Sequence, residues 1–230
     1  MPMDKTQQFA GLLQKHGQGI GKVVDYDPLT DHLFPFDFTA SNTELSAETV
    51  ADTRAFSAWI AAALQKDLCR YGIGGYFEHR TLYGRSAHFN TSDEPRRLHL
   101  GIDIWGEAST LVYAPFTGKV HSFQDNDVFG DYGPTIIIEH VFYGLKFYAL
   151  YGHLNRESLT GLYPGKTIRQ NEQLAEFGTA AENGNWPPHL HYQIMFDMEG
   201  KKGDYPGVCK FSEKGKYRQN IPDPNLILRF

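Results

Sequence analysis

The sequence predicts a mainly β protein, α+β overall, with an antiparallel β-sandwich or open barrel as its core and a helical N-terminal extension. Beyond residue 78, short alternating or apolar runs follow one another closely, separated by Gly, Pro, Asn or Asp. No helical pattern lies between them, which favours antiparallel pairing over βαβ units. Before residue 78 lies the strongest helical periodicity of the chain.

Composition narrows the classes of function. Of the 230 residues, 41% are hydrophobic and 21% are charged, which is typical of a globular protein and excludes a disordered chain. The net charge of −5 comes without a basic stripe, so we expect no nucleic-acid partner. No apolar run reaches the length of a membrane span, so no membrane partner is expected. The N-terminus is polar at Asp4, Gln7 and Gln8, where a secretory signal would be apolar, which predicts a cytoplasmic location.

Residues 1–78 are expected to form a helical and irregular extension. Residues 4–16 have apolar positions on one side of a short helix. Residues 17–43 are rich in Gly, Asp and Pro, which indicates an irregular ordered segment. Residues 46–71 carry apolar positions near helical spacing, and Gly72 is expected to stop this helix.

Residues 79–230 are expected to form a β-rich domain. The predicted strands lie, in chain order, within YFEHRTLYG, RLHLGIDIWG, TLVYAPFTGKVHSF, PTIIIEHVF, LKFYALYGHL, QLAEFG and HLHYQIMF. The residues after Met198 are rich in Gly, Lys and Pro, so we expect a loop and a terminal strap there.

Only two cysteines occur, Cys69 and Cys209. A single long-range disulfide is one interpretation, and two unpaired buried thiols are the favoured one. A zinc site of the CxxC type is excluded because the two cysteines are far apart in the chain.

His99 and Asp103 share the polar face of a predicted strand. Leu98, Leu100, Ile102 and Ile104 alternate with His99, Gly101 and Asp103 in RLHLGIDIW. In an ideal strand the two polar side chains would be about 13 Å apart, near the limit for binding one ion. We therefore expect a bend or bulge at Gly101, where the missing Cβ permits it. The alternative is a strand that exposes both side chains to solvent.

A second pair of candidates, His189 and His191, lies on the polar face of the last predicted strand. The two are i, i+2 neighbours, about 6.6 Å apart along the backbone, so both imidazoles enter one small volume. Pro187 and Pro188 before them keep the chain extended. Both histidines could bind one metal ion, or one could bind it while the other transfers protons. A chance pair among the ten histidines of the chain is the alternative.

His153 is the fifth candidate. It follows Tyr151 and Gly152 at the end of an apolar, aromatic strand, where substrates often approach. A strand-end histidine that contacts only water is the alternative.

These residues resemble the lysostaphin-type zinc metalloendopeptidases, peptidase family M23. His99-Leu-Gly-Ile-Asp103 is similar to the HxxxD motif of the family, His189-Leu-His191 to its HxH motif, and Tyr151-Gly-His153-Leu to its intervening histidine. Supporting similarities follow in the same order: Tyr83-Gly-Arg85, Ala114-Pro-Phe-Thr-Gly-Lys-Val120, Asp131-Tyr-Gly133 and Pro164-Gly165. The resemblance covers about residues 80–197.

The resemblance implies roles for these residues. His99, Asp103 and His191 would bind Zn²⁺, while His153 and His189 would act in proton transfer and transition-state stabilisation. The implied substrate is a peptide, either a peptidoglycan-type cross-link or a glycine-rich peptide. The substrate-binding residues would be Tyr83, Arg85, Tyr151 and Trp186. Packing in the core or at the rim is an equally open interpretation of the aromatic side chains, including Trp105.

Two classes of function remain open from the sequence. The first is a zinc-dependent metalloendopeptidase, which the presence of all five catalytic-type residues favours. The second is a zinc-binding module of the same family without peptidase activity, which would contact a partner through residues 1–78. Residues 1–78 are also expected to pack on the β core and to narrow the groove, because Phe34, Phe36 and Phe38 need a surface to bury against.

Overall fold

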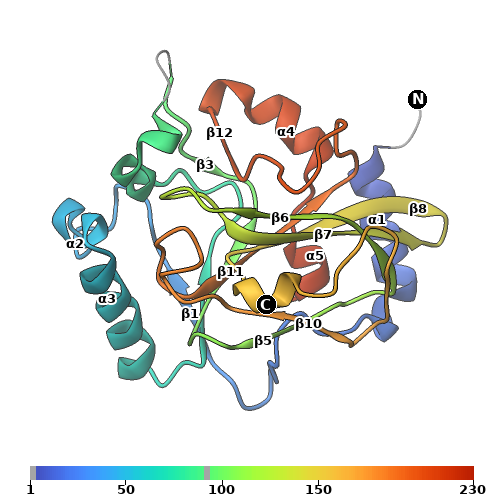
Figure 1. The fold of residues 1–230 in the computed structure, drawn as a ribbon, viewed down its shortest axis with the longest axis horizontal. Coiled ribbons are helices and arrows are strands. Elements are labelled where there is room, and N and C mark those ends of the chain that lie inside the picture. The colour runs from blue at the N-terminus through green and yellow to red at the C-terminus, as the bar shows by residue number, and fades with distance from the viewer. Residues whose placement is uncertain (1–3, 91–93) are drawn as a thin grey trace.

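The computed structural model describes residues 4–90 and 94–230 (Figure 1). Its α-helices are α1 (Lys5–His16), α2 (Ala47–Ala51), α3 (Thr53–Lys66), α4 (Lys214–Asn220) and α5 (Asn225–Leu228). Its strands are β1 (Leu33–Phe36), β2 (Tyr71–Gly74), β3 (Leu98–His99), β4 (Ile102–Trp105), β5 (Leu111–Tyr113), β6 (Gly118–Asn126), β7 (Gly133–Phe142), β8 (Leu145–Gly152), β9 (Thr167–Ile168), β10 (Gln173–Glu176), β11 (His189–Met195) and β12 (Val208–Cys209). The structure is therefore mostly β with few helices, as predicted.

One large sheet organises the molecule. Its strand order is β1-β2-β4-β11-β8-β7-β6-β9, and β10 with β5 and β12 with β3 form two small additional sheets. The large sheet is antiparallel except where β1 pairs in parallel with β2. Within the described residues β1 and β9 are its outer strands, so the sheet is open.

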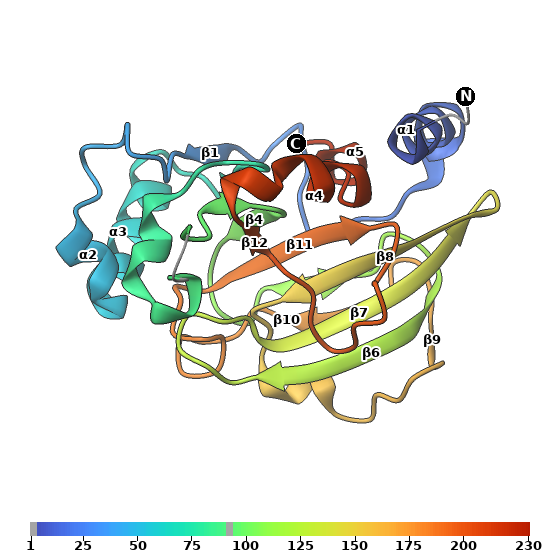
Figure 2. The ribbon, with the colours of Figure 1, turned by 90° about the horizontal axis from the view of Figure 1, so that it is seen from above.

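The two faces of the sheet are covered by different parts of the chain. Figure 1 shows α4 and the β5–β10 pair on opposite sides of the long strands. The alternation along β7 agrees, because Ile136 and Ile138 belong to the core shared with β5 and β10, whereas Ile137 belongs to the core shared with α4. Figure 2, which looks onto the long strands, shows α2 and α3 at one end of the molecule and α1 at the other. Phe9 of α1 and Ile227 of α5 belong to the core shared with β5 and β10.

The N-terminal residues differ from the prediction in two ways. Residues 46–71 form two helices instead of one, because Asp52 leaves the helical conformation and its side chain accepts a hydrogen bond from Ala55 N. The second helix, α3, ends at Lys66, and Gly72 is a residue of β2. The segment expected to be irregular contains β1, which extends the large sheet beside β2. The helix predicted over residues 4–16 is confirmed as α1.

The C-terminal segment is more ordered than predicted. The residues after Met198 were expected to form a loop and a strap, and they also contain β12, α4 and α5. Tyr205, Cys209 and Tyr217 of this segment are buried against the large sheet. The two cysteines are unpaired, as favoured by the sequence; Cys209 is buried and Cys69 is half-buried. None of the helices in residues 4–90 and 94–230 has the length and apolar character needed to cross a membrane.

Candidate metal centre

A sharp bend brings His99 and Asp103 to one point. β3 ends at His99, β4 begins at Ile102, and the bend between them lies at Gly101, as predicted. A Cβ atom at Gly101 would lie 2.6 Å from Cε1 and Nε2 of His191. Only glycine therefore allows the bend to approach the third candidate ligand so closely.

The register of the large sheet adds His191 to this pair. His191 of β11 lies directly opposite Asp103 of β4, and His189 lies opposite Trp105. On the other side of β11, His191 is opposite Gly152, which precedes His153. Because side chains of opposed residues share one face, the sheet places Asp103, His189 and His191 on the face covered by the C-terminal segment. The other two candidate histidines, His99 at the end of β3 and His153 after β8, join them there.

Three ligand-type atoms meet in the centre of this cluster. His99 Nε2 lies 3.0 Å from His191 Nδ1, and Asp103 Oδ1 lies 3.2 Å from the first and 3.1 Å from the second. Three ligand atoms placed tetrahedrally about 2.1 Å from one zinc ion would be about 3.4 Å apart. All three side chains are buried. The sequence therefore located a group with the size and composition of a zinc site.

The hydrogen bonds at the outer side of each ring determine where the protons lie. His99 Nδ1 donates to the carbonyl of Gly75 at 2.8 Å, which leaves its Nε2 unprotonated. His191 Nε2 donates to Gln193 Oε1 at 3.0 Å, which leaves its Nδ1 unprotonated. The Gln193 amide is oriented by its own donation to the carbonyl of Pro206. Two lone pairs and a carboxylate oxygen thus face one another with no proton between them, an arrangement that a cation stabilises.

Burial and charge keep these groups in the forms that bind metal. Burial, with the nearby charge of Arg80, lowers the pKa of His99 to about 3, so the ring is neutral at pH 7. Burial alone would raise the pKa of Asp103, but its interactions with His99, Arg80 and His191 hold that pKa well below its ordinary value. Neutral imidazoles and an ionised carboxylate are the required ligand states.

His153 and His189 form a second pair beside the cluster. Their ring centroids are 4.1 Å apart, and each Nδ1 donates to a backbone carbonyl at 2.8 Å, that of Asn183 for His153 and that of Pro187 for His189. The Nε2 atoms on the opposite sides of the rings are therefore unprotonated. Burial lowers the pKa of His189 to about 4 and, together with the charge of His189, holds that of His153 well below its ordinary value. Both rings are therefore neutral at pH 7, with one proton at Nδ1, and can accept a second proton at Nε2.

The family comparison agrees with this geometry. Residues 97–204 match the sequence profile of Peptidase family M23. The resemblance to this family that the motifs predict is thus confirmed for slightly less than half of the chain. No match was found among the curated proteins.

Solved structures with low sequence identity resemble parts of the chain. The catalytic domain of lysostaphin from Staphylococcus simulans has 16% identity and a TM-score of 0.40, over 70% of this chain and 97% of that one. A zinc-containing peptidase from Vibrio cholerae has 23% identity and a TM-score of 0.35, over 43% of this chain. A putative M23 peptidase from Pseudomonas aeruginosa has 20% identity and a TM-score of 0.37, over 59% of this chain. The matches span only 27% and 47% of the Vibrio and Pseudomonas chains.

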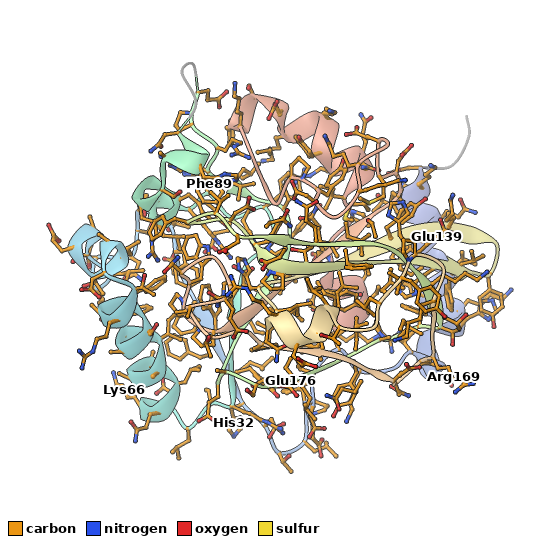
Figure 3. All side chains as sticks on the ribbon, viewed as in Figure 1. His32, Lys66, Phe89, Glu139, Arg169 and Glu176 are labelled. Carbon is orange, nitrogen blue, oxygen red and sulfur yellow. The ribbon has the colours of Figure 1, made fainter. Side chains whose placement is uncertain are left out.

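A small cavity of about 110 Å³ adjoins the histidines of the M23 segment. Its lining comes from residues 80–89 and Arg96, from residues 130–132 and Trp186, from the ends of the central strands and from residues 204–208. Phe89, one lining residue, is labelled in Figure 3 on the side of the molecule that carries α2 and α3. The described part of residues 1–78 contributes no residue to the lining of this cavity, and its narrowing of the groove stays a prediction. The extension packs behind the cavity instead, where Phe36, Phe38 and Phe56 contact Trp105.

Of the four predicted substrate-binding residues, two line the cavity and two lie away from it. Tyr83 and Trp186 line the cavity, as does Trp105, which stacks on His189 at 3.9 Å between ring centroids. Tyr151 is fully buried in the core on the other face of the sheet, against Tyr192. Arg85 lies behind the cavity wall, 4.7 Å from the ring centroid of Trp186.

Sequence reasoning missed three residues that hold the cluster. Arg80 donates to Asp103 Oδ2. Tyr132 places its hydroxyl 3.4 Å from His191 Nε2 and donates to the carbonyl of Tyr205. Gln193 accepts from His191. Only Gln193 had a signal, because it shares a strand face with His189 and His191; the contacts of the other two depend on chain segments that are distant in sequence.

Proposed function

We propose that this chain is a zinc-dependent metallopeptidase that hydrolyses peptide bonds. The observation that carries the proposal is the group of three unprotonated ligand atoms, His99 Nε2, Asp103 Oδ1 and His191 Nδ1, whose outer hydrogen bonds leave no proton between them. Two imidazoles and one carboxylate that leave a fourth position open form the ligand set of a catalytic zinc site. Zinc bound there would polarise the scissile carbonyl and lower the pKa of a water molecule toward 7.

The residues of the chain itself would carry the proton transfers. The Nε2 atoms of His153 and His189 are unprotonated, and both side chains line the cavity. One ring can therefore accept the proton of the attacking water and return it to the leaving amine. While it holds that proton at Nε2, the same ring can also donate a hydrogen bond to the developing oxyanion. Trp105, stacked on His189, fixes the orientation of that ring.

We propose an endopeptidase acting on peptidoglycan-type cross-links or glycine-rich peptides. The small volume of the cavity, about 110 Å³, and its aromatic lining by Tyr83 and Trp186 support a substrate with small side chains. Arg85 would act indirectly, by holding the Trp186 ring. Residues 1–78 would serve as an extension that supports the wall of the domain formed by 79–230.

A zinc-binding module without peptidase activity is the second candidate. The observation that favours it is the closure of the site. His99, Asp103 and His191 are at most 3% exposed, and residues 204–208 form part of the cavity lining beside them. A site this buried restricts the access of a peptide to the cluster.

A hydrolysis assay separates the two candidates. Protein loaded with one equivalent of zinc is incubated with pentaglycine and with muropeptides, and new amino termini are measured. We expect cleavage that is abolished by chelation, restored by zinc and reduced by about 10²–10⁴ in His153→Ala, the usual contribution of a positioned acid–base group. If zinc-loaded protein cleaves no peptide, the binding module is the correct interpretation.

A further inference from the structure

Arg80 is a buried cation in direct contact with a candidate metal ligand. Its side chain is 1% exposed, and Nη1 donates to Oδ2 of Asp103. The other carboxylate oxygen, Oδ1, faces His99 and His191 at 3.2 and 3.1 Å. The two oxygens of Asp103 therefore have separate partners, one toward the histidines and one toward the arginine.

The guanidinium of Arg80 is held in place from several directions. Nε donates to Glu78 Oε2 at 2.6 Å, and Nη1 also donates to the hydroxyl of Tyr83 at 3.2 Å. Glu78 is anchored in turn, because its Oε1 accepts from the backbone N–H of Phe38 at 3.1 Å. A Cβ at Gly74 would lie 2.5 Å from Nη2, so this position must be glycine for the arginine to fit. Rotation of Arg80 away from Asp103 would break several of these contacts at once.

We propose that Arg80 is a positioning residue that restricts Asp103 to one ligand oxygen and thereby preserves the open fourth position of the metal centre. A carboxylate can bind an ion through one or both oxygens. If both oxygens of Asp103 bound, the second would occupy space that water or substrate needs. Hydrogen bonds to the outer atoms of ligands commonly fix ligand geometry in this way. The inference rests on the proposed zinc site.

Arg80 also balances the charge of Glu78, which determines how the test is designed. Replacing Arg80 alone leaves the buried carboxylate of Asp103 and the partly buried carboxylate of Glu78 without their cation, which threatens folding. The variant Arg80→Gln/Glu78→Gln removes one charge of each sign and keeps similar side-chain volumes. Arg80→Lys is a second variant, which keeps the positive charge but offers one nitrogen in place of the planar fork.

The test uses Co²⁺ in place of zinc, because its visible absorption is strong in four-coordinate sites and weak in sites of higher coordination. The full chain is freed of metal, loaded with one equivalent of Co²⁺ and checked for native circular dichroism. We expect strong bands for the wild type, bands weakened several-fold for Arg80→Gln/Glu78→Gln, and intermediate bands for Arg80→Lys. With saturating zinc, kcat of the double variant should fall by about 10–100-fold. A matched control is Arg96→Gln, since Arg96 contacts the carbonyl of His88 and not a candidate ligand, so its Co²⁺ bands should be unchanged.

The two proposals fail in different ways. Wild-type protein that binds no Co²⁺ would contradict the zinc site itself. The role of Arg80 would be overturned, with the metal site left intact, if the folded double variant kept the Co²⁺ bands of the wild type. If the double variant does not fold, unchanged bands in Arg80→Lys would overturn it in the same way. A merely structural arginine would lower thermal stability without changing the bands of the folded protein.

Discussion

Gly101→Ala should disturb the candidate metal centre without removing any ligand. The added methyl group would lie 2.6 Å from Cε1 and Nε2 of His191 and 2.8 Å from the carbonyl oxygen of Tyr192. Neither neighbour can move away freely, because the His191 side chain is buried and the Tyr192 carbonyl belongs to the backbone of β11. Such overpacking costs about 1–3 kcal/mol, and each kcal/mol lowers Tm by about 2–4 °C in a chain of this size.

The assay is thermal unfolding of the metal-free and the zinc-loaded protein, together with zinc titration. We expect Gly101→Ala to lower Tm in both forms and to bind zinc more weakly, because the His191 ring must shift. Gly11→Ala is the matched control: Gly11 lies in α1 with open space around its Cβ position, so alanine should leave Tm unchanged or raise it slightly. Wild-type stability and zinc affinity in Gly101→Ala would refute the close approach of the bend to His191.

Three further predictions concern residues around the site and in the core. Burial lowers the pKa of His140 to about 4 in the folded protein. Below pH 6.5 the unfolded chain therefore binds more protons at this residue than the folded chain does. The free energy of unfolding should fall by about 3 kcal/mol for this residue as the pH drops from 6.5 to 4. Urea unfolding of His140→Phe should show a shallower pH dependence, and an unchanged slope would contradict the shift. A thiol reagent should label Cys69 faster than Cys209 in the native protein. Cys209 is 0% exposed, and burial raises the pKa of its thiol to about 12. Equal labelling rates would contradict the burial of Cys209. Tyr132→Phe should lower the free energy of unfolding in urea by about 0.5–1.5 kcal/mol. The variant should keep its zinc, because the hydroxyl contacts His191 without being a ligand. Loss of zinc would contradict this role of the hydroxyl.

The strand alternation predicted most of the candidate site. It placed His99 and Asp103 on one strand face and His189 and His191 on another, and the expected bend at Gly101 is present. Alternation alone did not determine which residue of the HxH pair joins the ligands. The pairing of β11 with β4 does so, since it sets His191 opposite Asp103. Register between distant strands is a tertiary property that the local sequence does not encode.

Tyr151 shows how a local backbone conformation defeats alternation. Tyr151 and His153 are two residues apart, so an uninterrupted strand would place both side chains on one face. β8 ends at Gly152, and His153 has φ of 63°, a left-handed conformation that is rare for a residue with a side chain. The turn directs His153 to the cavity while Tyr151 stays in the core. Strained residues of this kind are common at functional sites.

The parts of the fold that sequence reasoning missed depend on contacts between distant segments. β1 and β2 are short and rich in Phe and Gly, and no periodicity marks them as strands. Their pairing makes sense only in the folded chain, where Gly72 leaves room for Phe36: a Cβ there would lie 2.1 Å from that ring. Arg80 likewise gave no signal, since its partner Asp103 is 23 positions away.

Zinc content of four single variants tests the central claim most directly. His99→Ala, His191→Ala, His153→Ala and His189→Ala are purified from zinc-supplemented cultures, and bound zinc is measured per chain by atomic emission. His99→Ala and His191→Ala each remove one of three ligand atoms, so we predict that they lose zinc and become less stable. His153→Ala and His189→Ala remove no ligand and should retain it. Zinc retained in all four variants would contradict the site, and zinc lost in His189→Ala but kept in His191→Ala would exchange the roles of the two histidines.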